Sequence, residues 1–157
     1  MRRRVETIVA ASWATWLFLV HNVQMRLFAH NLLVCNVKPC VATATRDGTA
    51  LNYPLKIVVA EGGLAKEESE FNAEFTKHLL KKLDWAALAK TAAALGVATL
   101  PAEIPAGAAD DETFLKSVHD LVLDVHIKEG ELVCPNCERK YKITHGIPNM
   151  LLHEDEV

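Results

Sequence analysis

The chain has 157 residues, half of them apolar, and a formal net charge of −3 from 17 basic and 20 acidic residues. This length fits one domain, or one core with a small appended subdomain, and the apolar content excludes a disordered chain. The acidic balance argues against a protein that binds nucleic acid by itself, because neutralising phosphates normally requires a basic face. It leaves open a protein that works beside a basic partner.

Residues 1–24 combine a basic start with an apolar run. The uncharged stretch from Thr7 to Val20 is shorter than the roughly 20 residues that span a bilayer. It resembles the leading part of a signal peptide, but no small-x-small cleavage site follows. From Met25 the sequence reads like the start of a soluble protein. We therefore expect residues 1–24 to be an extension outside the working protein, such as a mis-assigned start. An organelle-targeting leader and a secretory signal or anchor are the alternatives, and a membrane partner is expected only if this extension is retained.

The next segments are rich in strand-forming residues. Residues 25–34 are largely apolar and lead into Cys35, which predicts a strand. Residues 52–60 alternate in the manner of a second strand. Near the other chain end, residues 123–133 alternate around Glu129–Gly130, which predicts a hairpin. Residues 141–144 predict a further strand, followed by the apolar run Gly-Ile-Pro-Asn-Met-Leu-Leu.

The middle of the chain has a helical period instead. Apolar residues recur every four positions between Phe71 and Leu83, which predicts an amphipathic helix. Asp84 is the expected N-cap of a second helix that ends at Gly96. Asp110 or Asp111 is the expected N-cap of a third helix, which runs to about residue 122.

The four cysteines form two close pairs, Cys35 with Cys40 and Cys134 with Cys137. In a secreted protein such pairs indicate a disulfide framework, and in a reducing compartment they indicate a zinc site with four thiolate ligands. Four thiolates fill a tetrahedral shell and leave no position for water, so such a site is structural. The histidines are given no ligand role for the same reason.

A thioredoxin-like redox pair is the competing interpretation of Cys134 and Cys137. Such a pair opens a helix after a strand. Residues 138–143 have no helical period, and a strand follows them. The segment is therefore predicted to be a knuckle, a tight turn whose backbone amides face the sulfurs.

These observations predict the α+β class, with a small zinc-binding antiparallel sheet built from both chain ends and an inserted central helical domain. The zinc-binding β domain is expected to comprise residues 25–60 and 123–157, and the helical domain residues 61–122. Within the helical domain, residues 100–109 contain two prolines and a glycine and predict a loop.

The sequence lacks the motifs G-x-G-x-x-G, G-x-x-x-x-G-K-[ST], G-x-S-x-G and H-E-x-x-H. An enzyme is therefore the less favoured class. A binding protein whose exposed apolar strand pairs with another chain is favoured instead. The alternatives are a zinc-ribbon module that binds nucleic acid and an oxidoreductase that uses the Cys134–Cys137 pair.

Several motifs, in order from Met25 to the C-terminal end, resemble one known family. They are MRLFAHNLL from Met25, Cys35-x4-Cys40, Asp84-Trp85, FLKSVHDLVL from Phe114, Glu129-Gly-x-Leu-x-Cys134-Pro-x-Cys137, and GIPNMLL from Gly146. Together they resemble the multifunctional methyltransferase activator subunits, which are small zinc-binding partners of tRNA, rRNA and release-factor methyltransferases.

The resemblance implies a non-catalytic subunit that activates and stabilises S-adenosylmethionine-dependent methyltransferases as heterodimers with several alternative catalytic partners. Zinc would be a structural cofactor bound by Cys35, Cys40, Cys134 and Cys137. The catalytic subunit would hold S-adenosylmethionine, and RNA would be reached only through it. The resemblance further implies a location in the cytoplasm and nucleus. The partner-binding surface would be made by Gly146, Ile147, Pro148, Asn149, Met150, Leu151 and Leu152.

Overall fold

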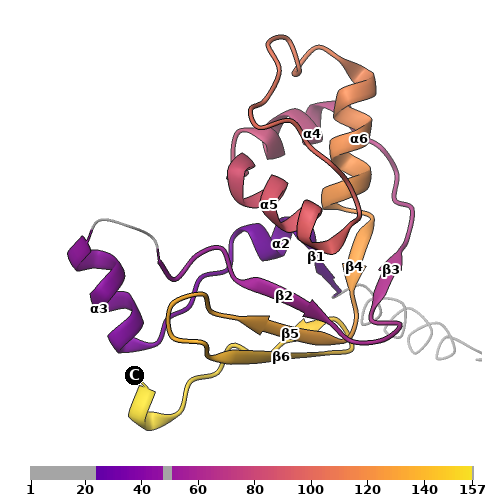
Figure 1. Cartoon of the computed structure of the whole chain (residues 1–157). Coiled ribbons are helices and arrows are strands. Elements are labelled where there is room, and N and C mark those ends of the chain that lie inside the picture. Colours follow the sequence, from indigo (N-terminus) through magenta and orange to yellow (C-terminus); the bar gives the residue numbers. More distant parts are fainter. Residues whose placement is uncertain (1–23, 48–50, 157) are drawn as a thin grey trace, which may run out of the picture.

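The computed structural model describes residues 24–47 and 51–156, and in this part of the chain the strands form two antiparallel sheets (Figure 1). The first sheet has the strand order β1-β4-β3 and consists of β1 (Met25–Arg26), β4 (Val125–Ile127) and β3 (Leu64–Lys66). The second has the order β2-β5-β6-β7 and consists of β2 (Lys56–Val59), β5 (Gly130–Val133), β6 (Lys140–Thr144) and β7 (Ile147–Pro148).

The helices gather mainly on one side of these sheets. The helices α4, α5 and α6 form a lobe above β2, with α2 at its base, whereas α3 lies apart from this lobe (Figure 1). This mixture of helices and antiparallel sheets confirms the predicted α+β class. Among the described residues, no helix is both long and apolar enough to cross a membrane. The helices are α2 (Leu27–Asn31), α3 (Lys38–Asp47), α4 (Ala73–Leu80), α5 (Trp85–Leu95) and α6 (Glu112–Val122), and a 3-10 turn, η1, spans Glu154–Glu156.

The helix boundaries follow the predicted capping residues. The carboxylate of Asp84 accepts a 3.0 Å hydrogen bond from the backbone N–H of Ala87 at the start of α5. Gly96 ends α5 in the left-handed conformation, with φ of 66°. Of the two aspartates proposed for α6, Asp111 is the N-cap, since its carboxylate accepts bonds from two backbone N–H groups of the first turn.

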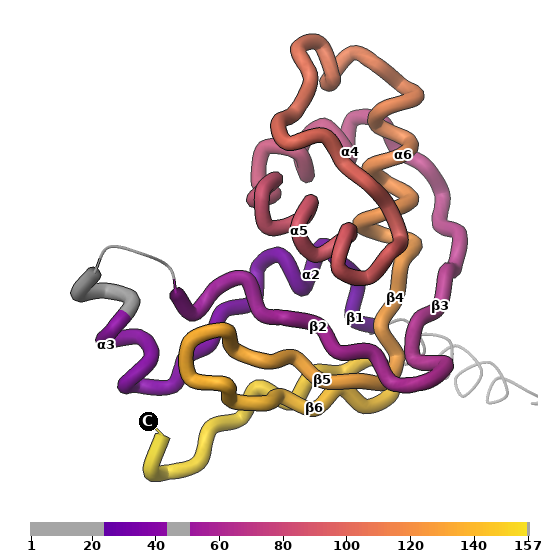
Figure 2. The backbone as a smooth tube through the Cα atoms, in the orientation of Figure 1, coloured from indigo at the N-terminus to yellow at the C-terminus, as the bar shows by residue number. Residues whose placement is uncertain are grey.

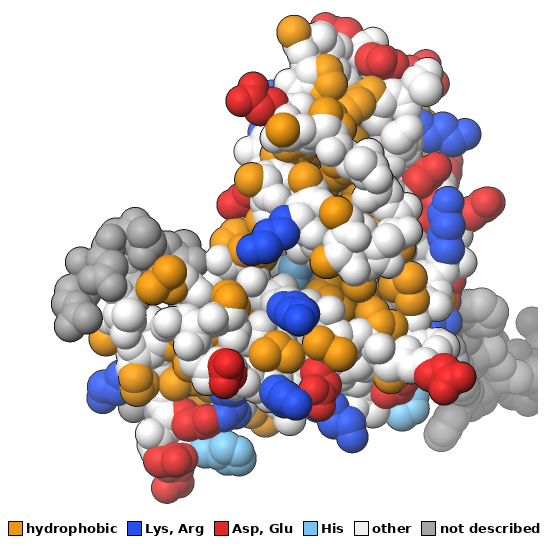
Figure 3. Space-filling view, viewed as in Figure 1, with side chains coloured by type: hydrophobic (Ala, Val, Ile, Leu, Met, Phe, Trp, Pro, Cys, Tyr) orange, Lys and Arg blue, Asp and Glu red, His pale blue; other side chains and the backbone are white. Residues whose placement is uncertain are grey.

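One buried core joins the helical lobe to both sheets. Leu88 and Val118 come from the helices, and Ile127, Leu132 and Ile143 come from the strands. Figure 3 shows further hydrophobic side chains along the junction between the lobe and the sheets. The division into a β domain and a helical domain with the residue ranges given above stays a prediction. The proposed extension at residues 1–24 lies outside the described residues except for Gln24.

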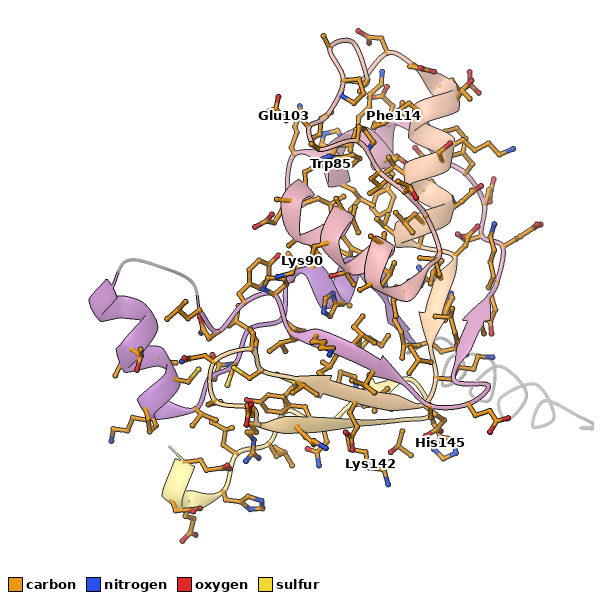
Figure 4. The ribbon with its side chains drawn as sticks, in the orientation of Figure 1. Trp85, Lys90, Glu103, Phe114, Lys142 and His145 are labelled. Atoms are coloured by element: carbon orange, nitrogen blue, oxygen red, sulfur yellow. The ribbon has the colours of Figure 1, made fainter. Side chains whose placement is uncertain are left out.

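The predicted loop at residues 100–109 is confirmed, and aromatic residues hold it in place. The indole N–H of Trp85 donates a 2.9 Å hydrogen bond to the carbonyl of Pro101. The rings of Trp85 and Phe114 face each other with centroids 5.8 Å apart (Figure 4). The start of the loop is therefore bonded to α5, whereas residues 101–107 are exposed to solvent.

The predicted strand at residues 25–34 is wrong beyond its first two residues. Met25 and Arg26 form β1, and the chain then turns into α2. Leu27, His30 and Asn31 are buried at helical spacing, and α2 packs against α5 and α6. A short, largely apolar run is compatible with a buried helix as well as with a strand, so the sequence pattern alone did not separate the two.

The predicted hairpin over residues 123–133 is also wrong. Strand β4 pairs with β1 and β3, whereas β5 pairs with β2 and β6. The chain therefore passes from one sheet to the other at Glu129–Gly130, and the chain ends contribute to two sheets instead of one. Glycine is needed at position 130, because a Cβ atom there would lie 2.4 Å from the carbonyl oxygen of Val58.

A buried histidine connects α2 to the residue before β2. The Nε2 atom of His30 lies 2.6 Å from the carbonyl oxygen of Leu55, which can only accept, so Nε2 carries the proton. Burial lowers the pKa of His30, and the hydrogen bond to the Leu55 carbonyl opposes this effect without cancelling it. The fold thus favours the neutral imidazole.

We expect this histidine to make the protein less stable in acid. Its folded pKa lies below the unfolded value of about 6.5, so its contribution to stability is complete above about pH 6.5 and is lost as the pH falls toward the folded pKa. The free energy of unfolding should fall on acidification with a slope of at most about 1.4 kcal/mol per pH unit from this group, and the melting temperature should fall with it. The variant His30→Gln should show a flatter pH dependence in thermal melts, and equal slopes in the two proteins would contradict the assignment. Any release of metal from the four cysteines in acid should affect the wild type and His30→Gln alike, so it does not contribute to the difference between their slopes.

Candidate metal site

The cysteines of the two pairs meet at one end of the second sheet. Cys35 precedes α3 and Cys40 lies in its first turn, while Cys134 precedes the turn between β5 and β6 and Cys137 lies in that turn. Figure 2 shows the indigo segment with α3 near the yellow C-terminal segment, although they are far apart in the sequence. The two cysteine pairs, which are far apart in the sequence, therefore lie close together in space, as predicted.

The sulfur positions suit a tetrahedral metal ion. The Sγ atoms of Cys35 and Cys137 lie 3.6 Å apart, and so do those of Cys40 and Cys134. All four sulfurs lie within 4.8 Å of one another. Zn–S bonds of about 2.3 Å in a regular tetrahedron place sulfurs roughly 3.8 Å apart. The four cysteines can thus hold a metal ion with little movement.

The segment between Cys134 and Cys137 is a turn, as predicted for a knuckle. Residues 135–137 form the turn, and β6 follows at Lys140 without a helix. The backbone N–H of Cys134 bonds the carbonyl of Arg139 at 2.9 Å. The backbone N–H of Asn136 points at the sulfur of Cys134 at 3.4 Å. The helical context that a thioredoxin-like pair requires does not occur at these described residues.

Two polar side chains that the sequence analysis missed also bond the sulfurs. The amide Nδ2 of Asn136 donates to the Sγ of Cys40 at 3.1 Å, and the hydroxyl of Tyr141 lies 3.0 Å from the Sγ of Cys35. Such donors offset the negative charge of thiolate ligands and fix their orientation. Asn136 lies inside the motif, and Tyr141 alternates with Ile143 on the inner face of β6, which is the signal that could have indicated it.

The protonation of the thiols links metal binding to pH. Burial raises the pKa of Cys40, Cys134 and Cys137. Burial also works to raise the pKa of Cys35, but hydrogen bonds from the Tyr141 hydroxyl and from a backbone N–H outweigh it and lower that pKa. Three of the four thiols therefore favour the protonated form without metal. Binding a metal ion must displace these protons, so the affinity rises with pH.

Arg139 connects the metal site to the C-terminal segment. It follows the knuckle, and its guanidinium lies over the ring of Tyr141, 5.2 Å from the ring centroid. Its Nη2 donates a 3.0 Å hydrogen bond to the carbonyl of Leu151, and its Nη1 forms an ion pair with Glu156. Arg139 thus contacts Tyr141, which bonds Cys35, and also bonds the end of the apolar run at Leu151.

The run from Gly146 to Leu152 begins at a position that only glycine fits. Gly146 has a φ of 78°, and a Cβ atom there would lie 2.9 Å from the Cα of Gln24. Its carbonyl accepts a 2.7 Å bond from the backbone N–H of Met25. The chain then enters β7, which pairs with Ile143 and Thr144 of β6 and is an edge strand of the second sheet.

The side chains of this run divide into two groups. Met150 and Leu152 are partly buried against the core. Ile147 is 54% exposed and Leu151 is 79% exposed. An edge strand with exposed apolar side chains is a feature of surfaces that pair with another chain.

These features define a class of protein: an α+β protein with four clustered cysteines that could hold a metal ion and an exposed apolar edge strand. The chain belongs to the Trm112p-like protein family, whose model matches residues 26–146.

Curated relatives are similar over most of the chain. The chain is 44% identical to the multifunctional methyltransferase subunit TRM112 homolog A of Arabidopsis thaliana over 135 residues, which cover 85% of this chain and all of the relative. It is 40% identical to multifunctional methyltransferase subunit trm112 of Schizosaccharomyces pombe, with 85% and 100% covered. It is 37% identical to multifunctional methyltransferase subunit TRM112 of Saccharomyces cerevisiae, with 82% and 96% covered. The predicted family is therefore confirmed.

Proposed function

We propose that this chain is a non-catalytic subunit that activates and stabilises S-adenosylmethionine-dependent methyltransferases. The relatives are named as multifunctional methyltransferase subunits, which supports a role in complexes with such enzymes. The observation that carries the proposal is the edge strand β7, whose Ile147 and the following Leu151 expose apolar side chains to solvent.

Zinc is the proposed ion at the four cysteines, and its role is structural. Four sulfur ligands favour zinc among the common divalent ions of the cell, and a filled shell offers no position for a reacting molecule. The ion would fix α3 against the turn between β5 and β6. Through Tyr141 and Arg139, it would also hold the run from Gly146 to Leu152 in its observed place.

The run from Gly146 to Leu152 is the proposed partner surface. A catalytic subunit would pair a strand with β7 and would cover Ile147 and Leu151. Covering apolar surface contributes about 25 cal/mol per Å², although the loss of free motion on association removes much of this gain. Several different catalytic subunits can use such a surface, because strand pairing relies on backbone groups that all chains share.

The proposed heterodimers act on tRNA, rRNA and translation release factor in the cytoplasm and nucleus. The catalytic subunit binds S-adenosylmethionine and contacts the substrate. RNA is reached only through that subunit, in keeping with the net charge of −3 on this chain.

Co-expression tests this function. A family-matched methyltransferase would be produced alone and together with this chain, and soluble yield and methyl transfer from labelled S-adenosylmethionine would be measured. We expect both quantities to rise at least about tenfold in the presence of the chain, because binding stabilises the folded partner by mass action. Methyl transfer by the chain alone would overturn the proposal. Equal soluble yield and equal methyl transfer of the methyltransferase with and without the chain would overturn it as well. Binding of RNA by the isolated chain would favour the nucleic-acid module instead.

A further inference from the structure

A second group of potential ligands lies away from the cysteines, where α6 meets β4. It comprises His119 and Asp120 in the last turn of α6 and Asp124 just before β4. One ligand atom from each residue lies within 4.8 Å of the other two. His119 is 1% exposed and Asp124 is 2% exposed. Nothing in the proposed activator role uses these residues.

The hydrogen bond of His119 shows which ring nitrogen is available. Its Nε2 lies 3.2 Å from the carbonyl oxygen of Glu70, which can only accept, so Nε2 carries the proton. The buried Nδ1 has no hydrogen-bond partner among the described residues. Oδ1 of Asp120 lies 3.5 Å from it. A buried ring nitrogen without a hydrogen-bond partner is unfavourable, and a cation bound between it and the nearby carboxylate would satisfy both groups.

The spacing of these two atoms fits a metal ion. With metal–ligand bonds of about 2.1 Å, a nitrogen and an oxygen 3.5 Å apart form an angle of roughly 115° at the metal, which is close to tetrahedral. We propose that His119, Asp120 and Asp124 form a second metal site, for a divalent transition-metal ion such as Zn²⁺ or Co²⁺. One imidazole with two carboxylates suits these ions better than Mg²⁺ or Ca²⁺, which select oxygen ligands throughout.

The groups around these ligands are arranged as they are around metal ligands generally. A metal-binding histidine normally donates its other N–H to a carbonyl or carboxylate, and a metal-binding carboxylate is itself hydrogen-bonded. His119 makes such a bond to Glu70. Oδ1 of Asp124 accepts bonds from the backbone N–H of Ser69 at 3.0 Å and from its hydroxyl at 2.6 Å. Two of the three ligands are thus already oriented.

An entry path reaches the third ligand. Asp120 lines a cavity of about 420 Å³ between β3, α6 and the residues that follow α5, and its side chain is 37% exposed. The lining is mostly apolar, with Leu64, Val97 and Leu121 among its residues. Three protein ligands leave a fourth tetrahedral position, which water or a small donor ligand would fill.

Metal stoichiometry of the full chain tests the second site. The protein would first be loaded with one equivalent of Zn²⁺ at the cysteines and then titrated with Co²⁺ by calorimetry and absorption spectroscopy. We expect a second, saturable equivalent whose d–d absorption appears without a thiolate-to-cobalt charge-transfer band. A total of one equivalent would overturn the proposal and leave a second proton on Nδ1 as the explanation of the His119–Asp120 contact. A thiolate charge-transfer band on addition of Co²⁺ would overturn it as well.

Two variants locate the second equivalent. Asp120→Asn keeps the shape of a partly exposed side chain and should weaken the second equivalent at least tenfold, while the first equivalent and the melting temperature of the one-zinc protein stay unchanged. Asp110→Asn removes a carboxylate whose side chain is 89% exposed and should leave both equivalents intact. Equal binding by Asp120→Asn and the wild type would contradict the assignment. The wild-type stoichiometry decides the proposal even where a variant does not fold.

Discussion

The variant Cys134→Ser is expected to lose the metal ion at the four cysteines and to lower the free energy of unfolding by about 4 kcal/mol or more. A hydroxyl replaces one of four sulfur ligands, and the buried thiols of Cys35 and Cys40 lose the ion that joins them to the knuckle. For a chain of this size the melting temperature should fall by about 10 °C or more. Partner binding should weaken together with stability, since the site holds the run from Gly146 to Leu152.

Thermal melts, metal analysis and a pull-down of the partner measure the three effects on one preparation. Ala42→Ser is the matched control, because it places the same hydroxyl on an exposed position of α3 next to the site. The control should retain metal, stability and partner binding. Unchanged melting and metal content in Cys134→Ser would contradict the structural role of the site.

The double variant Ile147→Asp and Leu151→Asp should separate partner binding from folding. Both side chains are more than half exposed, so the isolated chain should melt within about 2 °C of the wild type. In the complex, two carboxylates would be buried against an apolar partner surface without a counter-charge. We therefore expect the affinity for the catalytic subunit to fall at least about 100-fold.

The control for this variant changes exposed apolar residues elsewhere. Phe75 and Ile104 belong to the helical lobe and are 49% and 40% exposed. The double variant Phe75→Asp and Ile104→Asp should bind the partner like the wild type in calorimetric titrations. Similar losses of affinity in the two double variants, or full affinity in the variant with Ile147→Asp and Leu151→Asp, would show that the partner surface lies elsewhere.

The features that the sequence predicted correctly are those that depend on neighbouring residues. The capping aspartates and Gly96 act within one helical turn, and the knuckle at Cys134 follows from a motif of four residues. The meeting of the two cysteine pairs is a long-range feature, but it was predictable because a metal ion with four ligands requires both pairs.

The features that were predicted wrongly or missed depend on contacts between distant residues. The choice between strand and helix at residues 27–31 is decided by Asn31, whose side chain bonds both the backbone N–H and the carbonyl of Asp84. The separation of β4 from β5 is decided by the pairing of β4 with Met25–Arg26. Neither contact leaves a local pattern in the sequence.

The missed side chains around both candidate metal sites have the same explanation. Tyr141 reaches Cys35 across 106 positions of the chain, and His119 reaches the carbonyl of Glu70 across 49. In the sequence alone, a histidine or tyrosine at a spacing typical of buried positions cannot be distinguished from an ordinary core residue. Its role becomes visible only when the position of its hydrogen-bond partner is known. Only the folded structure shows that Nδ1 of His119, which has no hydrogen-bond partner among the described residues, lies 3.5 Å from a carboxylate oxygen.

We propose that this chain works as a zinc-containing subunit bound to a methyltransferase. Native mass spectrometry of the complex purified from its source, combined with metal analysis, tests this claim most directly. We expect heterodimers of this chain with methyltransferases, each with zinc that is lost in Cys134→Ser. Recovery of a homogeneous monomer without any methyltransferase would contradict it.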